Sequence, residues 1–219
     1  MSLPPALLFD AYGTMFDVQS VTAALNAHFP GKGAQLAQSW RTKQLEYTWQ
    51  RTLMGRYADF EAVTAESLRY ACALHQCEYS QALWATLRER YGRLATFPEV
   101  PATLAALRER GVRLGILSNG SPAMLDELIA HHRLTDTFEA VISVDPLRRY
   151  KPDPAVYQLA VDRLKLGSDG IGFVSANGWD ASGAKSFGFR VFWINRGGLP
   201  AETSGFAPDH VLGDLSGLL

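Results

Sequence analysis

Five short apolar runs, separated by stretches of helical periodicity, constrain the fold of this chain more than any other feature. Each run is bounded by Gly, Pro, Asp, Asn or Arg, which is typical of buried strands. The runs are 6–9 (ALLF), 112–118 (VRLGILS), 138–144 (FEAVISV), 170–175 (GIGFVS) and 190–195 (RVFWIN). Between the later runs lie helical patterns, several with a proline in the first turn and a glycine just past the end. This alternation predicts an α/β fold with a doubly wound, Rossmann-like parallel sheet.

One interval, residues 16–96, breaks the alternation because it contains no strand pattern. It is rich in helical patterns instead: VQSVTAALNAHF, AQLAQSWRTKQLEYTWQRTLMG, FEAVTAESLRYACALHQ and SQALWATLRERYGRL. Such an interval is too long to be a connecting loop. We therefore expect a helical subdomain, the cap, at residues 16–96, inserted into an α/β core domain formed by residues 1–15 and 97–219.

The composition limits the possible partners. The 219 residues, 47% of them hydrophobic, suffice for one sizeable core plus a smaller one. A formal net charge of -1 provides no basic field for nucleic acid. Cys72 and Cys77, expected in one helix, match neither a disulfide framework nor a metal motif. The N-terminal MSLPPA lacks signal-peptide features, and no stretch has transmembrane length. We expect a cytoplasmic protein with no nucleic-acid or membrane partner.

Polar side chains gather where the expected strands end. In an open parallel sheet those ends meet at one edge, where ligands bind. The residues are Asp10, Thr14, Ser118, Asn119, Lys151, Ser175, Asn177 and Asp180. Singly, an Asp or Ser after a strand is more often a helix N-cap than a catalyst. Together, two carboxylates, a lysine and several hydroxyl and amide groups at one edge indicate a catalytic site.

Four of these segments resemble the motifs of a known superfamily. FDAYGT, SNGSP, KPDPAVY and SANGWDASGAKSFG look like the four motifs of the haloacid dehalogenase superfamily, in order and spacing. The whole chain, cap included, resembles its metal-free L-2-haloacid dehalogenase (type II) branch. The resemblance implies that Asp10 is the catalytic nucleophile.

Two departures from the phosphatases of that superfamily bear on metal binding. Those enzymes carry a second aspartate two residues after the nucleophile, where this chain has Tyr12. They also carry an acidic pair in the last motif, where this chain has Ser175 and keeps Asp180. A dianionic phosphate approaching two carboxylates needs a cation such as Mg²⁺ between them. A haloalkanoate carries one charge, which Lys151, Arg41 and backbone N–H groups could balance. We expect no metal and no cofactor.

The resemblance also implies roles for the core residues. Lys151, with Tyr157 nearby, would keep Asp10 ionised, because an opposite charge favours the carboxylate form. Thr14, Ser175 and Asn177 would orient Asp10 and the ester formed on it. Because none of the five histidines falls in a motif, Asp180 is the candidate base for the hydrolytic water.

Substrate contacts follow from the same resemblance. Ser118 and the N–H of Asn119 would hold the substrate carboxylate. Arg41, reaching down from the cap, would cradle the halide with Asn119 and Trp179. On composition alone, Arg41, Lys43 and Glu46 read as a solvated helix face. The expected apolar walls, each of which could equally be a packing residue, are Tyr12, Leu45, Phe60 and Trp179.

The implied activity is that of an (S)-2-haloacid dehalogenase, a hydrolase acting on carbon–halogen bonds. L-2-haloalkanoic acids and haloacetates would become 2-hydroxy acids with inversion at C2, through an ester on Asp10. The partners would be the haloalkanoate, the halide product and a second copy in a homodimer. Two alternatives stay open, namely a phosphatase or other hydrolase on the same fold and a non-catalytic relative.

Overall fold

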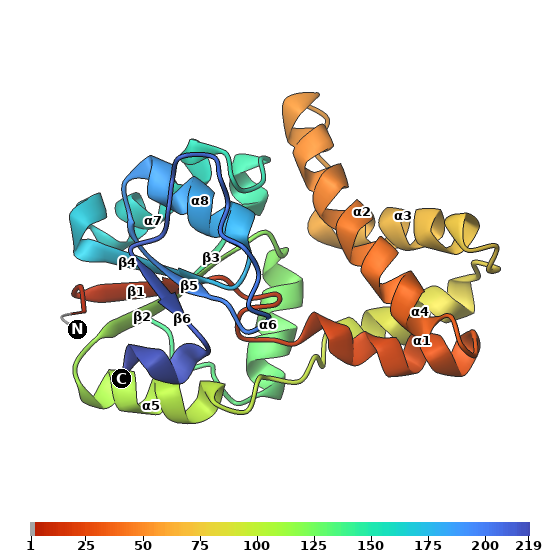
Figure 1. Cartoon of the computed structure of the whole chain (residues 1–219), viewed down its shortest axis with the longest axis horizontal. Coiled ribbons are helices and arrows are strands. Elements are labelled where there is room, and N and C mark those ends of the chain that lie inside the picture. The colour runs from red at the N-terminus through yellow and green to blue at the C-terminus, as the bar shows by residue number, and fades with distance from the viewer. Residues whose placement is uncertain (1–2) are drawn as a thin grey trace.

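The computed structural model describes residues 3–219, and in that range it contains one six-stranded sheet with helices on both faces and a helical block beside it (Figure 1). The strands are β1 (Ala6–Phe9), β2 (Arg113–Ser118), β3 (Ala140–Ser143), β4 (Ile171–Ser175), β5 (Arg190–Ile194) and β6 (His210–Leu212). Their order is β3-β2-β1-β4-β5-β6, and neighbouring strands are parallel. The predicted doubly wound α/β fold is confirmed.

The register of the central strands brings their carboxyl ends together. Phe9, the last residue of β1, pairs with Ile116 on β2 and with Val174 on β4. All residues of β1 and β4 are buried, because helices cover both faces of a parallel sheet. The backbone N–H of Asp10 donates to the carbonyl of Val174 at 2.9 Å. Asp10 therefore emerges at the carboxyl edge, between the ends of β2 and β4.

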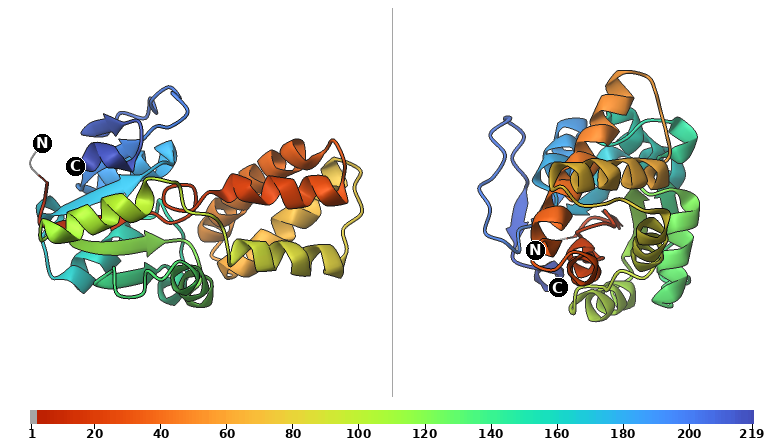
Figure 2. Two further views of the ribbon diagram at one scale, coloured as in Figure 1. Left: turned by 90° about the horizontal axis from the view of Figure 1, so that it is seen from below. Right: turned by 90° about the vertical axis from the view of Figure 1, so that its right-hand side faces the viewer.

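The helices of the core form two layers, with α5 and α6 on one face of the sheet and α7 and α8 on the other (Figures 1 and 2). They are α5 (Val100–Glu109), α6 (Pro122–His131), α7 (Pro154–Leu164) and α8 (Gly178–Phe187). The Ser121 hydroxyl caps α6 by accepting from Met124 N–H, and the Asp153 carboxylate caps α7 by accepting from Ala155 N–H. α8 ends at Gly188, whose φ of +112° favours glycine.

The cap residues form helices and stand at the carboxyl edge of the sheet (Figure 2). After the 3-10 helix η1 (Val18–Val21) come α1 (Thr22–His28), α2 (Gly33–Leu53), α3 (Phe60–Leu74) and α4 (Gln81–Tyr91). α2 packs along α3, where the buried Trp40 donates its indole N–H to the Thr64 carbonyl at 2.8 Å. The cap thus has an apolar centre of its own.

Two chain segments connect the cap to the core, and they pair with each other. Phe97 N–H donates to Met15 O at 3.1 Å, and Asp17 N–H donates to Ala95 O at 2.8 Å. Phe16 and Thr96 form an isolated antiparallel bridge between these bonds. The division into residues 1–15 with 97–219 and residues 16–96 stays a prediction, and this pairing is where it would fall.

Some elements differ from the sequence expectation. The pattern did not predict β6, a three-residue edge strand with Val211 exposed, because so short a run has little hydrophobic signal. Cys77 lies beyond the end of α3 rather than within the same helix as Cys72, and both thiols are free. Within residues 3–219, no helix has both the length and the apolar character needed to cross a membrane.

Candidate active site

Asp10 is the centre of a buried polar cluster at the carboxyl edge of the sheet. Its side chain is almost inaccessible, and the residue is 5% exposed. The Lys151 ammonium donates to Asp10 Oδ1 at 2.9 Å. The Thr14 hydroxyl and the Asn177 amide donate to Oδ2 at 3.0 and 2.8 Å. A carboxylate buried among such donors is held in one orientation.

Lys151 lies between two carboxylates. Besides Asp10, its ammonium donates to Asp180 Oδ2 at 2.6 Å and to the Leu117 carbonyl at 3.1 Å. The Asn119 side-chain oxygen accepts from the Lys151 backbone N–H at 3.0 Å, which fixes the loop before α7. Burial lowers the pKa of Lys151, but Asp10 and Asp180 outweigh it, so the net direction is upward. The side chain is therefore a cation at neutral pH.

Asp180, in the first turn of α8, is fully buried. Its Oδ2 accepts from the Ser175 hydroxyl at 3.1 Å as well as from Lys151, and its Oδ1 accepts from the Tyr157 hydroxyl at 2.8 Å. Burial, together with the charge of Asp10, raises the pKa of Asp180 to about 6, against the opposing pull of Lys151. Asp180 can therefore exchange a proton near neutral pH, which suits a general base.

Tyr157 belongs to the same cluster through Asp180. Its hydroxyl donates to the carboxylate that also accepts from Lys151, and no hydrogen bond joins it to Asp10 in the described part of the chain. Burial and the Asp180 charge raise the pKa of Tyr157 well above its usual value. The side chain is therefore a neutral phenol and donates a hydrogen bond to Asp180.

Thr14, Ser175 and Asn177 connect these groups. The Thr14 hydroxyl also accepts from the Ala176 N–H at 2.8 Å, so it ties the loop after β1 to the loop after β4. The Ser175 hydroxyl accepts from the Asn177 N–H at 3.2 Å, which holds Asn177 beside Asp10. Of the three residues expected to orient Asp10, Thr14 and Asn177 contact it directly, whereas the Ser175 side chain contacts Asp180 and the backbone of Asn177.

Tyr12 lies where the phosphatase pattern would place a second aspartate. Its buried ring packs on Phe60 and Tyr91, with centroids 5.5 and 6.0 Å apart. Within residues 3–219, no group of three or more His, Cys, Asp or Glu side chains could hold a metal ion. The position between Asp10 and Asp180 is taken by the Lys151 ammonium.

The cap contributes Arg41, whose side chain crosses to the core. Its Nη2 donates to the Tyr12 carbonyl at 3.3 Å and to Asn177 Oδ1 at 3.4 Å. Arg41 is therefore not part of a solvated face. Lys43 and Glu46, by contrast, pair with each other at 2.6 Å. The Lys43 ammonium also lies over the Tyr70 ring, 4.2 Å from its centroid, so only Glu46 has a largely exposed side chain.

The remaining residues expected to contact the substrate differ in burial. Phe60, Ser118 and Asn119 are buried, whereas Leu45 and Trp179 are half-buried. The Ser118 hydroxyl accepts from the Gly120 N–H at 3.1 Å. Trp179 packs edge to face on Trp49 of α2, with centroids 5.5 Å apart. In the described part of the chain, the buried indole N–H of Trp179 has no hydrogen-bond partner, so it is available to an anion.

Two groups support the site although the sequence alone assigns neither of them a role. Gln44 accepts a hydrogen bond from Arg41 inside the cap, and its signal is a polar residue in the buried stripe of α2 at Leu36, Trp40 and Thr48. Arg196 donates to the Thr14 carbonyl at 3.0 Å and has no sequence signal that links it to this loop.

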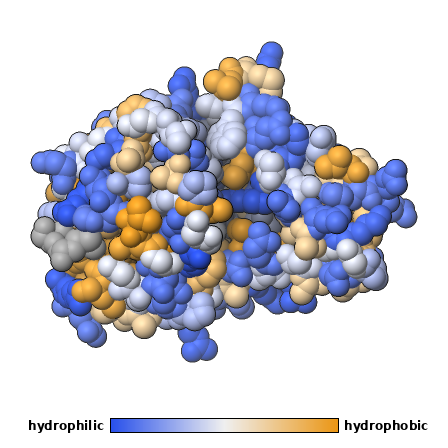
Figure 3. Space-filling view, viewed as in Figure 1, coloured by the Kyte–Doolittle hydropathy of each residue, from blue (hydrophilic) through white to orange (hydrophobic). Residues whose placement is uncertain are grey.

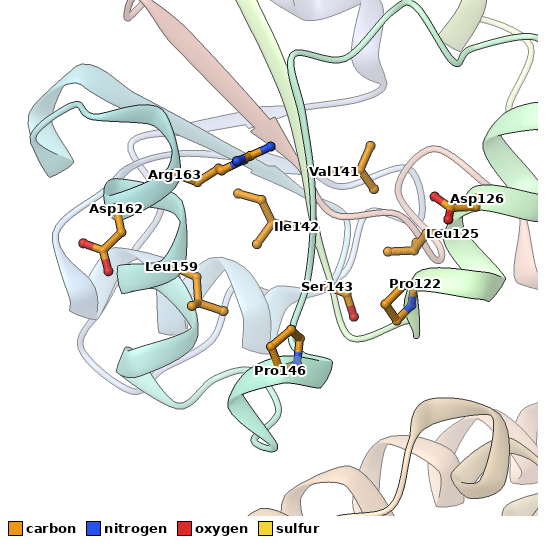
Figure 4. Close-up of a pocket in the computed structure, with 10 residues that line it drawn as sticks. All are labelled: Pro122, Leu125, Asp126, Val141, Ile142, Ser143, Pro146, Leu159, Asp162 and Arg163. Atoms are coloured by element: carbon orange, nitrogen blue, oxygen red, sulfur yellow. The ribbon is translucent and has the colours of Figure 1, made fainter.

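A separate hollow of about 480 Å³ lies at the β3 edge of the core (Figure 4). Side chains from α6, β3 and α7 surround it, including Leu125, Ile142 and Leu159. The charged groups at its rim are Asp126, Asp162 and Arg163. Because none of its lining residues belongs to the cluster around Asp10, it is not the candidate active site.

Comparisons with known proteins agree with this geometry. The model of the haloacid dehalogenase-like hydrolase family matches residues 4–188. The chain belongs to the haloacid dehalogenase-like hydrolases. Curated relatives in this family include the (S)-2-haloacid dehalogenase of Pseudomonas sp. (strain YL), 47% identical over 203 residues, which are 93% of this chain and 88% of the relative. Another is haloacetate dehalogenase H-2 of Moraxella sp. (strain B), 46% identical over 94% of this chain and 92% of the relative.

A solved member of the family matches the whole fold. It is the L-2-haloacid dehalogenase from Xanthobacter autotrophicus with chloropropionic acid covalently bound. The match has a TM-score of 0.92 and 41% identity, and it covers 99% of this chain and 97% of the other. The family resemblance expected from the four motifs is confirmed.

Proposed function

We propose that this hydrolase dehalogenates L-2-haloalkanoic acids and haloacetates to 2-hydroxy acids, with inversion at C2. The observation that carries the proposal is the buried Asp10 carboxylate, held by Lys151, Thr14 and Asn177 at the end of β1. The names of the relatives as (S)-2-haloacid and haloacetate dehalogenases support it, as does the covalently bound chloropropionic acid of the Xanthobacter autotrophicus protein.

In the first step, an oxygen of Asp10 attacks C2 of the substrate from the side opposite the halogen. The C–O bond forms as the carbon–halogen bond breaks, and the bonding electrons leave with the halide. The product is an ester between Asp10 and C2, now inverted. Arg41, Asn119 and Trp179 receive the halide, and their stabilisation counts most as charge develops on it.

The second step hydrolyses the ester and regenerates the free enzyme. Asp180 takes a proton from water as the water oxygen attacks the carboxyl carbon of the ester. The bond between that carbon and the ester oxygen breaks, and the proton passes to the departing hydroxy acid. The pKa of Asp180, raised to about 6 by burial, leaves most of this base unprotonated at neutral pH. The carboxylic acid left on Asp10 releases its remaining proton to solvent, and Lys151 stabilises the carboxylate that reforms there.

The substrate contacts belong to the same proposal. Ser118 and the backbone N–H of Asn119 bind the substrate carboxylate, and the walls are Tyr12, Leu45, Phe60 and Trp179. The single negative charge of a haloacid would face Lys151 and Arg41. A dianionic phosphate would face the carboxylates of Asp10 and Asp180, and among residues 3–219 no group of His, Cys, Asp or Glu side chains could hold a metal ion to balance it. This charge balance favours a haloacid over a phosphate ester.

We also propose a homodimer in the cytoplasm. The exposed apolar side chains at the end of α2, Leu53 and Met54, support a surface that a second copy covers. Sedimentation equilibrium at micromolar concentration is expected to give twice the monomer mass of 24.1 kDa. A monomer under those conditions would contradict the dimer.

The function is tested by measuring halide release from the two enantiomers of 2-chloropropionate. We expect chloride and D-lactate from the L enantiomer and no release from the D enantiomer. Asp10→Asn should release none, because a neutral amide is a poor nucleophile. Wild-type protein that is inactive on the L enantiomer, but hydrolyses p-nitrophenyl phosphate with Mg²⁺, would show a phosphatase instead.

A further inference from the structure

Gln44 is a fully buried amide inside the cap, one helical turn after Arg41 on α2. Its Oε1 accepts a hydrogen bond from Arg41 Nη1 at 2.8 Å. Because a buried polar side chain is costly unless each polar atom has a partner, Gln44 calls for an explanation at a position that otherwise faces apolar packing.

The neighbours of Gln44 fix which way its amide points. The Thr64 hydroxyl donates its hydrogen to the Phe60 carbonyl at 2.5 Å, so the Thr64 oxygen can only accept from Gln44. Gln44 Nε2 therefore faces Thr64, at 2.7 Å, with Tyr91 Oη at 3.4 Å. The opposite atom, Oε1, is thereby turned toward Arg41, whose guanidinium can only donate.

Within residues 3–219, every hydrogen bond of Arg41 ends on a neutral oxygen and Arg41 forms no ion pair. The acceptors are Gln44 Oε1, Asn177 Oδ1 and the Tyr12 carbonyl. Burial raises the pKa of the Tyr12 and Tyr91 phenols near it, so these are uncharged too. Arg41 is thus oriented by groups that leave its positive charge unbalanced.

The other arginines of the cap interior are held differently. Arg51 pairs with Glu66 at 2.6 Å, and Arg88 pairs with Glu61 and Glu127 at 2.9 and 2.7 Å. A carboxylate at position 44 would orient Arg41 equally well but would neutralise it. The neutral amide therefore leaves the positive charge of Arg41 available to an anion bound beside it.

We propose that Gln44 is a positioning residue for the leaving halide: it aims the Arg41 guanidinium across the cap–core boundary while leaving its charge for the anion. This inference rests on the proposed dehalogenase function and deepens it. Gln44 touches neither substrate nor halide, and it acts through Arg41.

The test replaces Gln44 by methionine, which has a similar shape and no hydrogen-bonding amide. Gln50→Met on the exposed side of the same helix is the matched control. Single-turnover halide release is measured with L-2-chloropropionate and L-2-bromopropionate. Q44M should slow chloride release about tenfold. Arg41→Ala, which removes the guanidinium altogether, gives the upper limit of the effect and should slow chloride release about 100-fold. Bromide release should slow less, because bromide needs less stabilisation, so the bromide-to-chloride rate ratio should rise.

A second variant and a second readout keep the proposal testable if Q44M folds poorly. Gln44→Glu keeps the acceptor that faces Arg41, although it loses the donor that faces Thr64, and it should weaken halide binding by pairing with Arg41. Chloride binding to the resting protein, measured by ³⁵Cl NMR line broadening, should weaken in Q44E and in Q44M but not in Q50M.

The outcomes separate this inference from the proposed function. Wild-type protein that releases no halide would overturn the function. Unchanged chloride binding in Q44E, or Q44M with an unchanged bromide-to-chloride ratio and equal slowing on both substrates, would overturn the positioning role, whatever the activity of the wild type.

Discussion

At the scale of residues, one ammonium pairs with two carboxylates to which the proposed function gives different roles. Lys151 contacts both Asp10 and Asp180. Asp10 has the Thr14 and Asn177 donors on its other oxygen, whereas Asp180 has the Ser175 hydroxyl and the Tyr157 phenol. The pKa of Asp180 is raised to about 6 by burial. The cluster thus places the proposed nucleophile and the proposed base within the reach of one lysine.

Asp180→Asn should separate the two chemical steps. An amide cannot take a proton from water, so the ester on Asp10 should form and persist. We expect one equivalent of halide per enzyme and a mass increase equal to the carboxyalkyl group that C2 brings to Asp10. Asp162→Asn, on the exposed side of α7, is the control and should turn over normally. Continued turnover by D180N would remove Asp180 from the base role.

The pH dependence of ester hydrolysis should follow Asp180. The base works only as a carboxylate. In the resting cluster, burial and the charge of Asp10 raise the pKa of Asp180 to about 6, and the ester removes the Asp10 charge, so the hydrolysis rate should fall as pH drops below 6. Stopped-flow measurement of the second step between pH 4 and 8 checks this. A rate that is flat across that range would contradict the assignment.

A single turnover in ¹⁸O-water tests covalent catalysis. If Asp10 is the nucleophile, water attacks the ester carboxyl carbon, so the heavy oxygen enters Asp10 and not the first hydroxy acid. With enzyme in excess, the product should contain ordinary oxygen, and the peptide containing LLFDAYGT should gain the label. Heavy oxygen in the first-turnover product, with none on Asp10, would indicate direct attack by water.

At the scale of elements, the approach of α8 to α7 depends on one glycine. A Cβ on Gly183 of α8 would lie 2.5 Å from Pro152 Cβ and 2.7 Å from Tyr157 Oη. The absent side chain allows the Tyr157 hydroxyl to reach Asp180. The packing of two helices is thereby linked to the hydrogen bonds of the base.

Gly183→Ala should therefore cost both stability and activity. Overpacking of this kind costs about 1–3 kcal/mol of unfolding free energy. We also expect slower ester hydrolysis, because Tyr157 must move from Asp180. Gly197→Ala is the control, since its Cβ would meet Leu199 Cγ at an ordinary 3.7 Å. Urea unfolding and second-step rates measure the two effects. Equal behaviour of both variants would contradict the packing argument.

The elements also show what could be predicted from the sequence and why. Asp10, Ser118 and Ser175 directly follow or end buried strands, and parallel topology alone brings such residues to one edge. The contact of Arg41 with Asn177 depends on how α2 lies against the core, which no local pattern encodes. Gln44 interrupts a buried stripe, but only the orientation of Thr64 shows what it does.

At the scale of the whole molecule, the site forms only where cap and core meet. The core supplies Asp10, Lys151 and Asp180, and the cap supplies Arg41. Figure 3 shows that the surface is hollowed between the two parts and that polar side chains cover much of this face. With a formal net charge of -1, the protein does not attract anions as a whole. Attraction of an anionic substrate must come from these local cations.

The whole molecule should also be indifferent to divalent metal ions. An ion bound only by the folded state would raise stability by RT ln(1 + [L]/Kd), about 4 kcal/mol at a thousandfold excess over Kd. Here the Lys151 ammonium already occupies the position between Asp10 and Asp180 that a metal ion would need, and Tyr12 offers no carboxylate. Exhaustive chelation should therefore change neither the thermal midpoint nor halide release, and added Mg²⁺ should change neither in return. Lys151→Ala provides the comparison, because removing the cation leaves two buried carboxylates facing each other and should abolish activity. A loss on chelation that Mg²⁺ restores, in either readout, would mean that a metal completes this site and that Lys151 is not the cation on which it depends.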